Sequence, residues 1–245
     1  MLIDVHSHID SEEFNSDRDS ILKKCNIIVV DAGINYENNL KVLEIVAKYS
    51  NVIPAIGLHP ENINYDDPEG EIDRVTSLAS KAEIISEIGL DYYWIKDEEK
   101  RKVQREILGI LLSIAEKENK PVVVHVRGGL KDFLEIIASF KVRFDIHAYE
   151  GSVKNAMKIV EMGGYISFPP VIVRDKQRQN VALNVPKERV LTETDSPFLG
   201  PTRDRNEPCN VKVTLEALST LWRVDTKEIE EIIFQNFRRF LNKSY

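Results

Sequence analysis

The sequence has only two cysteines, Cys25 and Cys209, and they lie far apart in the chain. Neither occurs in a spacing that is typical of a zinc site, and two cysteines cannot build the dense disulfide framework of a small secreted protein. We therefore expect no disulfide framework, and we expect a reducing cytoplasm as the compartment.

Long apolar runs are also missing. No stretch approaches the roughly 20 residues that are needed to cross a bilayer. The first residues, Met1-Leu2-Ile3-Asp4, show no basic region followed by an apolar one and a cleavage site. The sequence therefore predicts a soluble, unprocessed chain with no membrane contact, and it indicates no obligate protein partner.

Positively charged residues are fewer than negatively charged ones, and the formal net charge is −7. This balance excludes a general electrostatic attraction to nucleic acid, so a polyanion must bind through a local basic patch or through bound cations. The 245 residues are 42% hydrophobic and 30% charged, which suits a packed core with a solvated surface. No linker or low-complexity tract divides the chain, and we expect one domain over residues 1–245.

Short apolar runs rich in valine and isoleucine recur along the chain, each followed by a turn and a helical pattern. The runs are Leu2–His8, Asn26–Gly33, Val52–Pro60, Glu83–Asp91, Pro121–Arg127, Arg143–Tyr149, Gly164–Pro169 and Arg189–Pro197. Such runs are typical of parallel strands that are buried on both faces. Eight strand–helix units in a chain of this length predict an α/β fold, the single-domain (β/α)8 TIM barrel. An open doubly wound sheet is the alternative, but its usual glycine-rich phosphate loop is absent.

Two helices have recognisable starts. Asp97 is placed to cap a helix whose apolar face is predicted to comprise Val103, Ile107, Ile110, Leu111 and Ile114. Near the end of the chain, Asp225 and Glu228 resemble a capping box that opens a helix with the face Ile229, Ile232, Ile233, Phe237 and Phe240.

All five histidines lie at the carboxyl ends of predicted strands. They are His6 and His8 on the first strand, His59 on the third, His125 on the fifth and His147 on the sixth. These strand ends form the catalytic face of a barrel. A single strand-end histidine is more often a hydrogen-bonded structural residue, but five out of five indicate a shared site.

The His6-x-His8 pair adds geometry to this placement. Alternate residues of a strand point to the same face, so both imidazoles are predicted to project inward and to be able to bind one divalent cation. Asp4 has the same parity and could orient one of the rings. Such pairs also occur on surfaces without a metal, so the pair needs carboxylate partners.

Glu87 and Asp195 are the carboxylates that could complete the site. Each lies near the end of an apolar strand, where a charge is costly to bury unless it is paired or coordinates a metal. An ion pair with a neighbouring cation is the alternative for Glu87. Glu193 shares the parity of Asp195, and we expect a supporting role for it.

Arg127 alternates with His125 on the fifth predicted strand, so both side chains should face the mouth of the barrel. A guanidinium group at that place suits a phosphate or carboxylate ligand, although a salt bridge to a local carboxylate is the alternative. Further cations are predicted on mouth loops, and scattered surface charge is the alternative for them. They are Arg174, Lys176, Arg178, Arg203 and Arg205.

These motifs, in this order, resemble the TatD family of metal-dependent deoxyribonucleases within the amidohydrolase superfamily. The matching segments are 4–10 (DVHSHID), 57–60 (GLHP), 87–93 (EIGLDYY), 125–127 (HVR), His147, 193–197 (ETDSP) and 205–208 (RNEP). The resemblance covers essentially the whole chain. It departs at Ala148-Tyr149, where the family often has Cys-Phe, and in the segment from Val171 to Lys187 with Pro169-Pro170 before it.

The resemblance implies two divalent cations per chain, of zinc, manganese, magnesium or iron. His6, His8, Glu87 and Asp195 would hold one, and Glu87, His125 and His147 the other, with Glu87 shared. His59, Arg127, Arg205, Asn206 and Glu207 would contact the substrate. The implied activity is cleavage of DNA, single-stranded or at a 3′ end, and the family suggests 3′-to-5′ exonucleolytic attack.

Two such cations can activate a water molecule and stabilise the charge on a reacting phosphate. Asp195 is the best candidate for the general base, and Glu87 the best candidate for a shared catalytic ligand. An amidohydrolase or esterase acting on a lactone, an amide or a small phosphoester would use the same ligands and is the main alternative. A non-catalytic barrel that binds nucleic acid or a protein is the second, although it would not need a complete ligand set.

Overall fold

Each of the eight predicted runs forms a strand in the computed structural model, which describes residues 1–242. The strands are β1 (Leu2–Ser7), β2 (Ile27–Ala32), β3 (Val52–Ile56), β4 (Ile84–Asp91), β5 (Val122–Arg127), β6 (Phe144–Ile146), β7 (Tyr165–Phe168) and β8 (Val190–Thr192). Adjacent strands in the sequence pair in parallel, in the order β1 to β8. The last three residues of the predicted domain, 243–245, lie outside the described residues.

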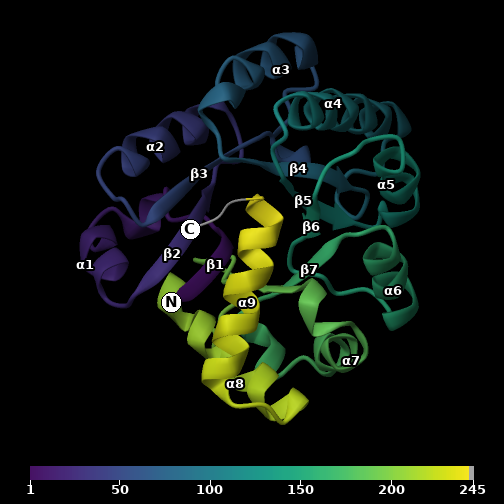
Figure 1. Cartoon of the computed structure of the whole chain (residues 1–245). Helices are drawn as coiled ribbons and strands as arrows, with labels where there is room; N and C mark the ends of the chain where they lie inside the picture. The colour runs from purple at the N-terminus through teal and green to yellow at the C-terminus, as the bar shows by residue number, and fades with distance from the viewer. Residues whose placement is uncertain (243–245) are drawn as a thin grey trace.

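Helices follow the strands and surround them (Figure 1). They are α1 (Arg18–Lys23), α2 (Tyr36–Val46), α3 (Pro68–Thr76), α4 (Glu98–Lys117), α5 (Leu130–Ile137), α6 (Val153–Glu161), α7 (Lys176–Asn184), α8 (Val211–Trp222) and α9 (Thr226–Leu241). Because helices cover the outside and side chains fill the inside, the strands are buried on both faces. All eight residues of β4 are buried, for example.

The end of β1 and the loop after β8 meet, which brings the two edges of the sheet together in a nearly closed barrel. The backbone N–H of His8 donates to Ser196 O at 2.8 Å, and that of Asp195 donates to His6 O at 2.9 Å. The predicted (β/α)8 barrel is therefore confirmed, and the open doubly wound sheet is wrong. The same two bonds place the metal-ligand candidates of β1 and the loop after β8 beside one another.

The helix starts are largely as predicted. Asp97 Oδ1 accepts a hydrogen bond from Lys100 N at 2.9 Å at the start of α4, and Asp225 caps α9 through Lys227 N. The apolar face of α4 differs at one residue, because Ile110 is 44% exposed. The buried stripe instead runs through Gln104, Ile107, Leu108, Leu111, Leu112 and Ala115. Ile110 lies at the margin of that stripe, and the helical repeat of 3.6 residues turns its side chain toward the solvent.

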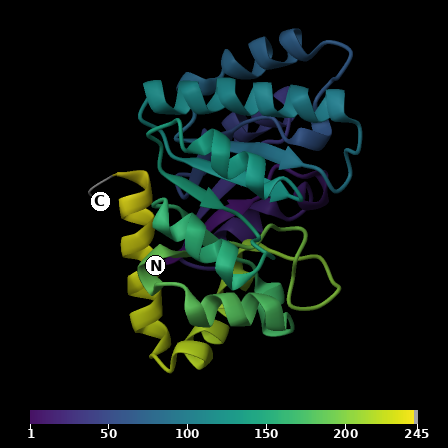
Figure 2. The ribbon, with the colours of Figure 1, turned by 90° about the vertical axis from the view of Figure 1, so that its right-hand side faces the viewer.

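Helix α9 covers the amino-terminal ends of the strands. Asn236 Nδ2 donates to Val190 O at 2.7 Å at the start of β8, and Arg143 Nε, just before β6, donates to Phe240 O at 2.7 Å. Figure 1 shows α9 in front of the barrel, and Figure 2 shows the yellow-green loop after β8 on the opposite side. The carboxyl ends of the strands are thus left open for a site. No helix within residues 1–242 is long and apolar enough to span a bilayer.

Cys25 and Cys209 form a single disulfide bond, which the sequence analysis did not predict when it expected no disulfide framework and a reducing compartment. The two residues are 184 positions apart, and their Cα atoms lie 6.1 Å from one another. Cys25 follows α1, after the first strand, and Cys209 lies in a short 3-10 helix, Pro208–Asn210, after the eighth. Because β1 and β8 are neighbours in the ring, the two loops meet, and the spacing in the sequence could not show this.

Candidate metal centre

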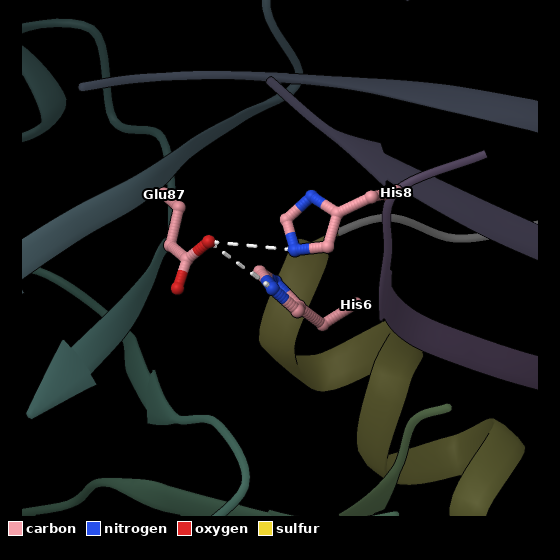
Figure 3. Close-up of side chains that lie close together, drawn as sticks. All are labelled: His6, His8 and Glu87. Atoms are coloured by element: carbon pink, nitrogen blue, oxygen red, sulfur yellow. Dashed lines mark ion pairs between the residues drawn. The ribbon is translucent and has the colours of Figure 1, made fainter. Parts of the chain in front are cut away.

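The six residues predicted as metal ligands converge at the carboxyl end of the barrel. His6 lies in β1 and His8 just after it, Glu87 lies within β4, His125 lies in β5, His147 follows β6 and Asp195 lies after β8. Figure 3 shows one oxygen of Glu87 directed at the imidazoles of both His6 and His8. The predicted inward direction of the His-x-His pair is therefore confirmed.

The first group of donor atoms has the spacing of ligands around one cation. His6 Nε2 lies 3.6 Å from Glu87 Oε2 and 3.7 Å from Asp195 Oδ1. The corresponding distances from His8 Nε2 are 3.5 Å and 3.4 Å. Ligands held tetrahedrally at zinc-like bond lengths are about 3.3 Å apart. Two imidazole nitrogens and two carboxylate oxygens at these separations fit a borderline divalent ion.

The second group uses the other oxygen of the same glutamate. Glu87 Oε1 lies 2.9 Å from His147 Nε2 and 3.3 Å from His125 Nδ1, and the two nitrogens are 3.3 Å apart. Each group therefore has its own pair of histidines, and Glu87 contributes one oxygen to each. This is the arrangement expected of a carboxylate that bridges two cations.

Hydrogen bonds outside the cluster set the proton positions of two rings. His8 Nδ1 lies 2.7 Å from Ala32 O, which can only accept, so Nδ1 keeps a proton and Nε2 is the nitrogen that can offer a lone pair to a cation. His125 Nε2 lies 2.9 Å from Asp91 Oδ2 and donates to it, so Nδ1 is the nitrogen that can bind a cation. In both rings the free nitrogen is the one that faces Glu87.

His6 and His147 leave buried nitrogens without hydrogen-bond partners. Both ring nitrogens of His6 and Nδ1 of His147 lack one, and His6 is fully buried. An unsatisfied buried nitrogen is costly, and coordination of a cation would satisfy His6 Nε2. The residues present therefore fit a metal centre by donor chemistry, spacing and unsatisfied atoms.

The electrostatics of the side chains alone point the same way. Burial lowers the pKa of His6 to about 4, with a further contribution from the charge of His147, so the His6 ring is neutral. Burial also opposes protonation of His8, but Asp195 and Glu87 outweigh it and raise the pKa of His8 to about 10. Likewise, Asp91 and Glu87 overcome burial and raise the pKa of His125 to about 9. A divalent cation can take the place of these protons, since metal binding displaces them from its ligands.

The carboxylates remain ionised in spite of their burial. The imidazoles of His59, His147 and His6 outweigh the burial of Glu87 and hold its pKa well below the usual value. His8 does the same for Asp195 through a hydrogen bond. The backbone of Asp195 has a φ of 53°, a left-handed conformation that is uncommon for non-glycine residues and frequent at functional sites.

His59, predicted to contact substrate, lies next to the second donor group. Its Nε2 is 3.4 Å from Glu87 Oε1, while its Nδ1 accepts a hydrogen bond from Glu61 N at 3.2 Å. Burial lowers the pKa of His59 to about 4, so the ring carries one proton, and that proton must be on Nε2. His59 thus presents a hydrogen-bond donor to the cluster, in contrast to the lone pairs of His8 and His125.

Asp4 and Glu193 support the cluster from below. Asp4 Oδ1 accepts from Thr194 N at 2.7 Å, so it holds the loop that carries Asp195 and does not orient an imidazole. Glu193 Oε1 accepts from Ala148 N at 2.8 Å, and its Oε2 accepts from Ser167 Oγ at 2.6 Å. Ala148, where the sequence departs from the family pattern, is thus tied through its backbone N–H.

Arg127 stacks on aromatic rings at the mouth. Its guanidinium carbon lies 4.1 Å from the centroid of Tyr93, and its Nε is 3.8 Å from Glu150 Oε1. The side chain is 39% exposed, so it remains accessible to an anion. Its predicted contact with substrate stays a prediction.

The turn at residues 205–207 is occupied by contacts within the chain. Arg205 pairs with Asp17, and Glu207 pairs with Lys24. Asn206 is buried, and its Nδ2 donates to Thr194 O at 2.8 Å and to Phe198 O at 2.7 Å. The structure therefore does not bring these side chains to the metal-ligand candidates, and their contact with substrate stays a prediction.

Two of the remaining predicted cations of the mouth loops make contacts within the chain, and the other two are exposed. Arg178 is buried and pairs with Asp175, and Arg174 donates to Gly200 O at 3.2 Å. Lys176 and Arg203 are exposed. The basic patch predicted from the sequence is therefore smaller than the count of its residues indicates.

Asp91 and Gly89 are functional positions to which the sequence argument gave no role. Asp91 has the same strand parity as Glu87, and this signal could have identified it as a partner of His125. Gly89 lies between them with a φ of +148°, and a Cβ atom there would lie 1.8 Å from His125 O. Only glycine lets β4 approach β5 closely enough for both carboxylates to reach the His125 ring.

Comparisons with known proteins identify the family of the chain. The model of the family described as TatD related DNase matches residues 3–242. An uncharacterized metal-dependent hydrolase of Methanocaldococcus jannaschii is 34% identical over 98% of this chain and 97% of its own length. The human deoxyribonuclease TATDN3 is 27% identical over 99% of this chain and 95% of its own length.

A solved structure confirms the fold. The TatD homologue YjjV of Escherichia coli superposes with a TM-score of 0.86 at 22% identity, over 99% of this chain and 98% of that chain. Together with the eight-stranded barrel and the converging histidines, the match over nearly the whole sequence shows that the chain belongs to the TatD family.

Proposed function

We propose that this TatD-family hydrolase cleaves phosphodiester bonds of DNA with the help of two divalent cations. The observation that carries the proposal is the division of Glu87 between two donor groups, with Oε2 facing His6 and His8 and Oε1 facing His147. A shared carboxylate of this kind suits two ions a few ångströms apart, as in many phosphodiesterases and nucleases. Relatives named deoxyribonuclease support DNA as the substrate.

Two such cations would supply a water molecule of lowered pKa and would stabilise charge on the attacking and leaving oxygens. Histidines and carboxylates accommodate zinc, manganese, magnesium or iron, since geometry and availability decide among them. The chain's own residues then have to orient the phosphate, accept a proton and hold the nucleic acid.

Asp195 is our candidate for the proton acceptor. Its Oδ1 faces the imidazoles of His6 and His8, and we assign the proton of the attacking water to its second oxygen. His59 donates from Nε2, and a phosphoryl oxygen beside Glu87 would accept that hydrogen bond. Asp195, the proposed proton acceptor, lies after β8, and His59, the proposed neutral hydrogen-bond donor, lies after β3.

Arg127 supplies positive charge at the edge of the site. Because the chain as a whole has a net charge of −7, attraction of DNA has to come from the cations and from local side chains of this kind. Removal of nucleotides from a 3′ end is the direction that the family resemblance suggests, and a cytoplasmic location is the compartment we propose. Because disulfide bonds are rare in a reducing cytosol, the state of Cys25 and Cys209 in protein isolated without reductant also tests the proposed location.

The test is cleavage of a single-stranded oligonucleotide, labelled at its 5′ or its 3′ end, with Mg²⁺ or Mn²⁺ and without. A panel of lactones, amides and phosphotriesters is assayed in parallel with the same enzyme. We expect metal-dependent DNA cleavage that Asp195→Ala abolishes. Clear turnover of a small ester with no cleavage of any DNA would replace the proposal by a small-molecule hydrolase.

A further inference from the structure

Three exposed aromatic side chains stand at the mouth of the barrel, and the cluster of ligands does not use them. Trp94 is 57% exposed, Phe198 59% and Tyr93 49%. They are the three aromatic residues among the exposed large hydrophobic side chains of residues 1–242. Exposed aromatic surface is costly, and gathered at a site mouth it indicates a binding role.

These residues lie on opposite sides of the candidate metal centre. Tyr93 and Trp94 follow β4, and Phe198 lies in the loop after β8. In a ring of eight strands in sequential order, β4 and β8 are diametrically opposed. The ligands between them include Glu87 from β4 and Asp195 from the loop after β8, so an aromatic surface lies on either side of the ligands.

The surface after β4 is held in place by named contacts. Trp94 N donates to Asp91 Oδ1 at 2.7 Å, and the rings of Tyr93 and Trp94 meet edge to face at 4.8 Å. Arg127 lies over Tyr93 at 4.1 Å and over Trp94 at 5.7 Å. Because Asp91 also holds His125, this surface is tied directly to the ligands.

The surface after β8 is anchored in a similar way. Phe198 N donates to Asp195 O at 2.8 Å, and Phe198 O accepts from Asn206 Nδ2 at 2.7 Å. The Phe198 ring lies 6.5 Å from the ring of His8. Buried Asn206 thus positions an exposed aromatic ring beside the centre, and this is the role that the structure supports for that residue.

A phosphodiester has one nucleoside on each side of its phosphate. We propose that Trp94, backed by Tyr93, and Phe198 stack the two bases that flank the phosphate seated at Glu87. Unpaired bases expose their faces to such rings, whereas the bases inside a duplex are already stacked on one another. Single-stranded DNA, the substrate that the family resemblance implies, would then be held through its bases without regard to sequence. This inference rests on the proposed function and adds to it the residues that hold the bases.

Kinetics on two matched substrates test the stacking. One is a hexathymidylate, and the other is the same hexamer with abasic sugars at every position, so the phosphates are equal and the bases are absent. We expect Trp94→Ala to lower kcat/KM on hexathymidylate by about tenfold or more, and to change it by less than about twofold on the abasic hexamer. Trp94→Phe, which keeps a ring, should retain most of the wild-type value.

Phe198→Ala should show the same selective loss, with Phe198→Tyr as its conservative partner. Leu183→Ala is the matched control for exposed apolar surface, because Leu183 is 55% exposed at the far end of α7 and lies outside the site. Equal losses on both hexamers would show that the rings support the loop and do not bind bases. No loss on either hexamer would also overturn the proposal.

Fluorescence separates this inference from the nuclease activity itself. The chain has two tryptophans, and Trp222 donates from Nε1 to Ala182 O at 2.8 Å, away from the mouth. In Trp222→Phe loaded with Mn²⁺ or Zn²⁺, only Trp94 emits. We expect saturable quenching by hexathymidylate and none by the abasic hexamer.

In Trp94→Phe, where only Trp222 emits, no quenching is expected. A wild type that cleaves neither hexamer would contradict the proposed nuclease, while quenching of Trp94 by bases would still support the stacking surface. Cleavage without any quenching of Trp94 would leave the nuclease standing and remove Trp94 from base binding.

Discussion

Asp91 Oδ2 lies 2.9 Å from Nε2 of His125, so a carboxylate at the end of β4 sets the tautomer of a candidate ligand on β5. The His125 Nδ1 lone pair is thereby directed at Glu87, 3.3 Å away. Partners of this kind fix both the orientation and the basicity of a metal-binding imidazole. The metal affinity of the second donor group should therefore depend on a residue that need not touch the cation.

Replacing Asp91 by asparagine should weaken that group. We expect Asp91→Asn to lower the affinity for the more weakly held cation by about 10- to 100-fold, measured by titration calorimetry with Mn²⁺ or Zn²⁺. Glu61→Gln is the control, because Glu61, Asp91 and His125 also form a group that could hold an ion themselves. A similar loss in both variants would show that Asp91 is a ligand, and an unchanged Asp91→Asn would contradict its orienting role.

His59 should act on substrate without holding metal. Its Nδ1 accepts from Glu61 N, so Nε2 carries the proton and has no lone pair for a cation. We expect His59→Ala to lower kcat by about 10²-fold or more, as for loss of one hydrogen-bond donor to a reacting oxygen, with unchanged metal content. Elemental analysis of the purified variant checks this, with His147→Ala as the variant expected to lose metal. Loss of one metal equivalent from His59→Ala would make it a ligand.

The disulfide should contribute strongly to stability. It closes a loop between residues 184 positions apart, and bonds across long loops restrict the unfolded chain most. We expect the double variant Cys25→Ser/Cys209→Ser to lose roughly 2–5 kcal/mol of unfolding free energy in urea titrations. Addition of a reductant should destabilise the wild type and leave the double variant unchanged. Two free thiols in the denatured, non-reduced protein would refute the bond.

A pH effect is expected from Asp31, a buried carboxyl group in β2. Burial, with the nearby Asp10 carboxylate, raises the pKa of Asp31 well above its usual 3.8. The folded chain therefore holds this proton more tightly than the unfolded chain does. Its stabilising contribution is present at acidic pH and is lost as the pH rises through the raised pKa.

Asp31→Asn should remove this pH-dependent loss of stability. In the wild type Asp10 N donates to Asp31 Oδ1 at 3.1 Å, and the asparagine keeps an oxygen that can accept this bond. Relative to the wild type, the variant should gain stability from pH 4 to pH 8, as followed by urea unfolding across that range. Asp66→Asn, at an exposed carboxylate, should show no such trend. If the wild type instead became more stable relative to Asp31→Asn as the pH rises, the effect would have the opposite sign and would contradict a raised pKa for Asp31.

The fold was predictable because its signals are local. Near-continuous apolar runs such as Ile84–Asp91 identify buried parallel strands, and their number identifies the barrel. The inward direction of His6 and His8 follows from the two-residue period of a strand. The direction of site residues that depends on a single strand could therefore be predicted from the sequence.

Contacts between distant loops were not predictable. The Cys25–Cys209 bond and the Arg205–Asp17 pair join the first strand–helix unit to the last. Neither contact can be predicted from the residue types or from their spacing in the sequence. The family resemblance implied that Arg205 contacts the substrate. The structure shows an acidic partner for it that lies 188 residues earlier.

The central claim is that Glu87 serves two cations in a nuclease. Its most direct measurement is the cleavage rate of a single-stranded oligonucleotide by chelator-treated enzyme as Mn²⁺ is added back in known equivalents. We predict that activity recovers fully only with the second equivalent, and that Glu87→Gln stays at least about 10²-fold below the wild type at every metal level. Full activity without metal, full recovery with one equivalent, or a Glu87→Gln enzyme as active as the wild type would contradict the account.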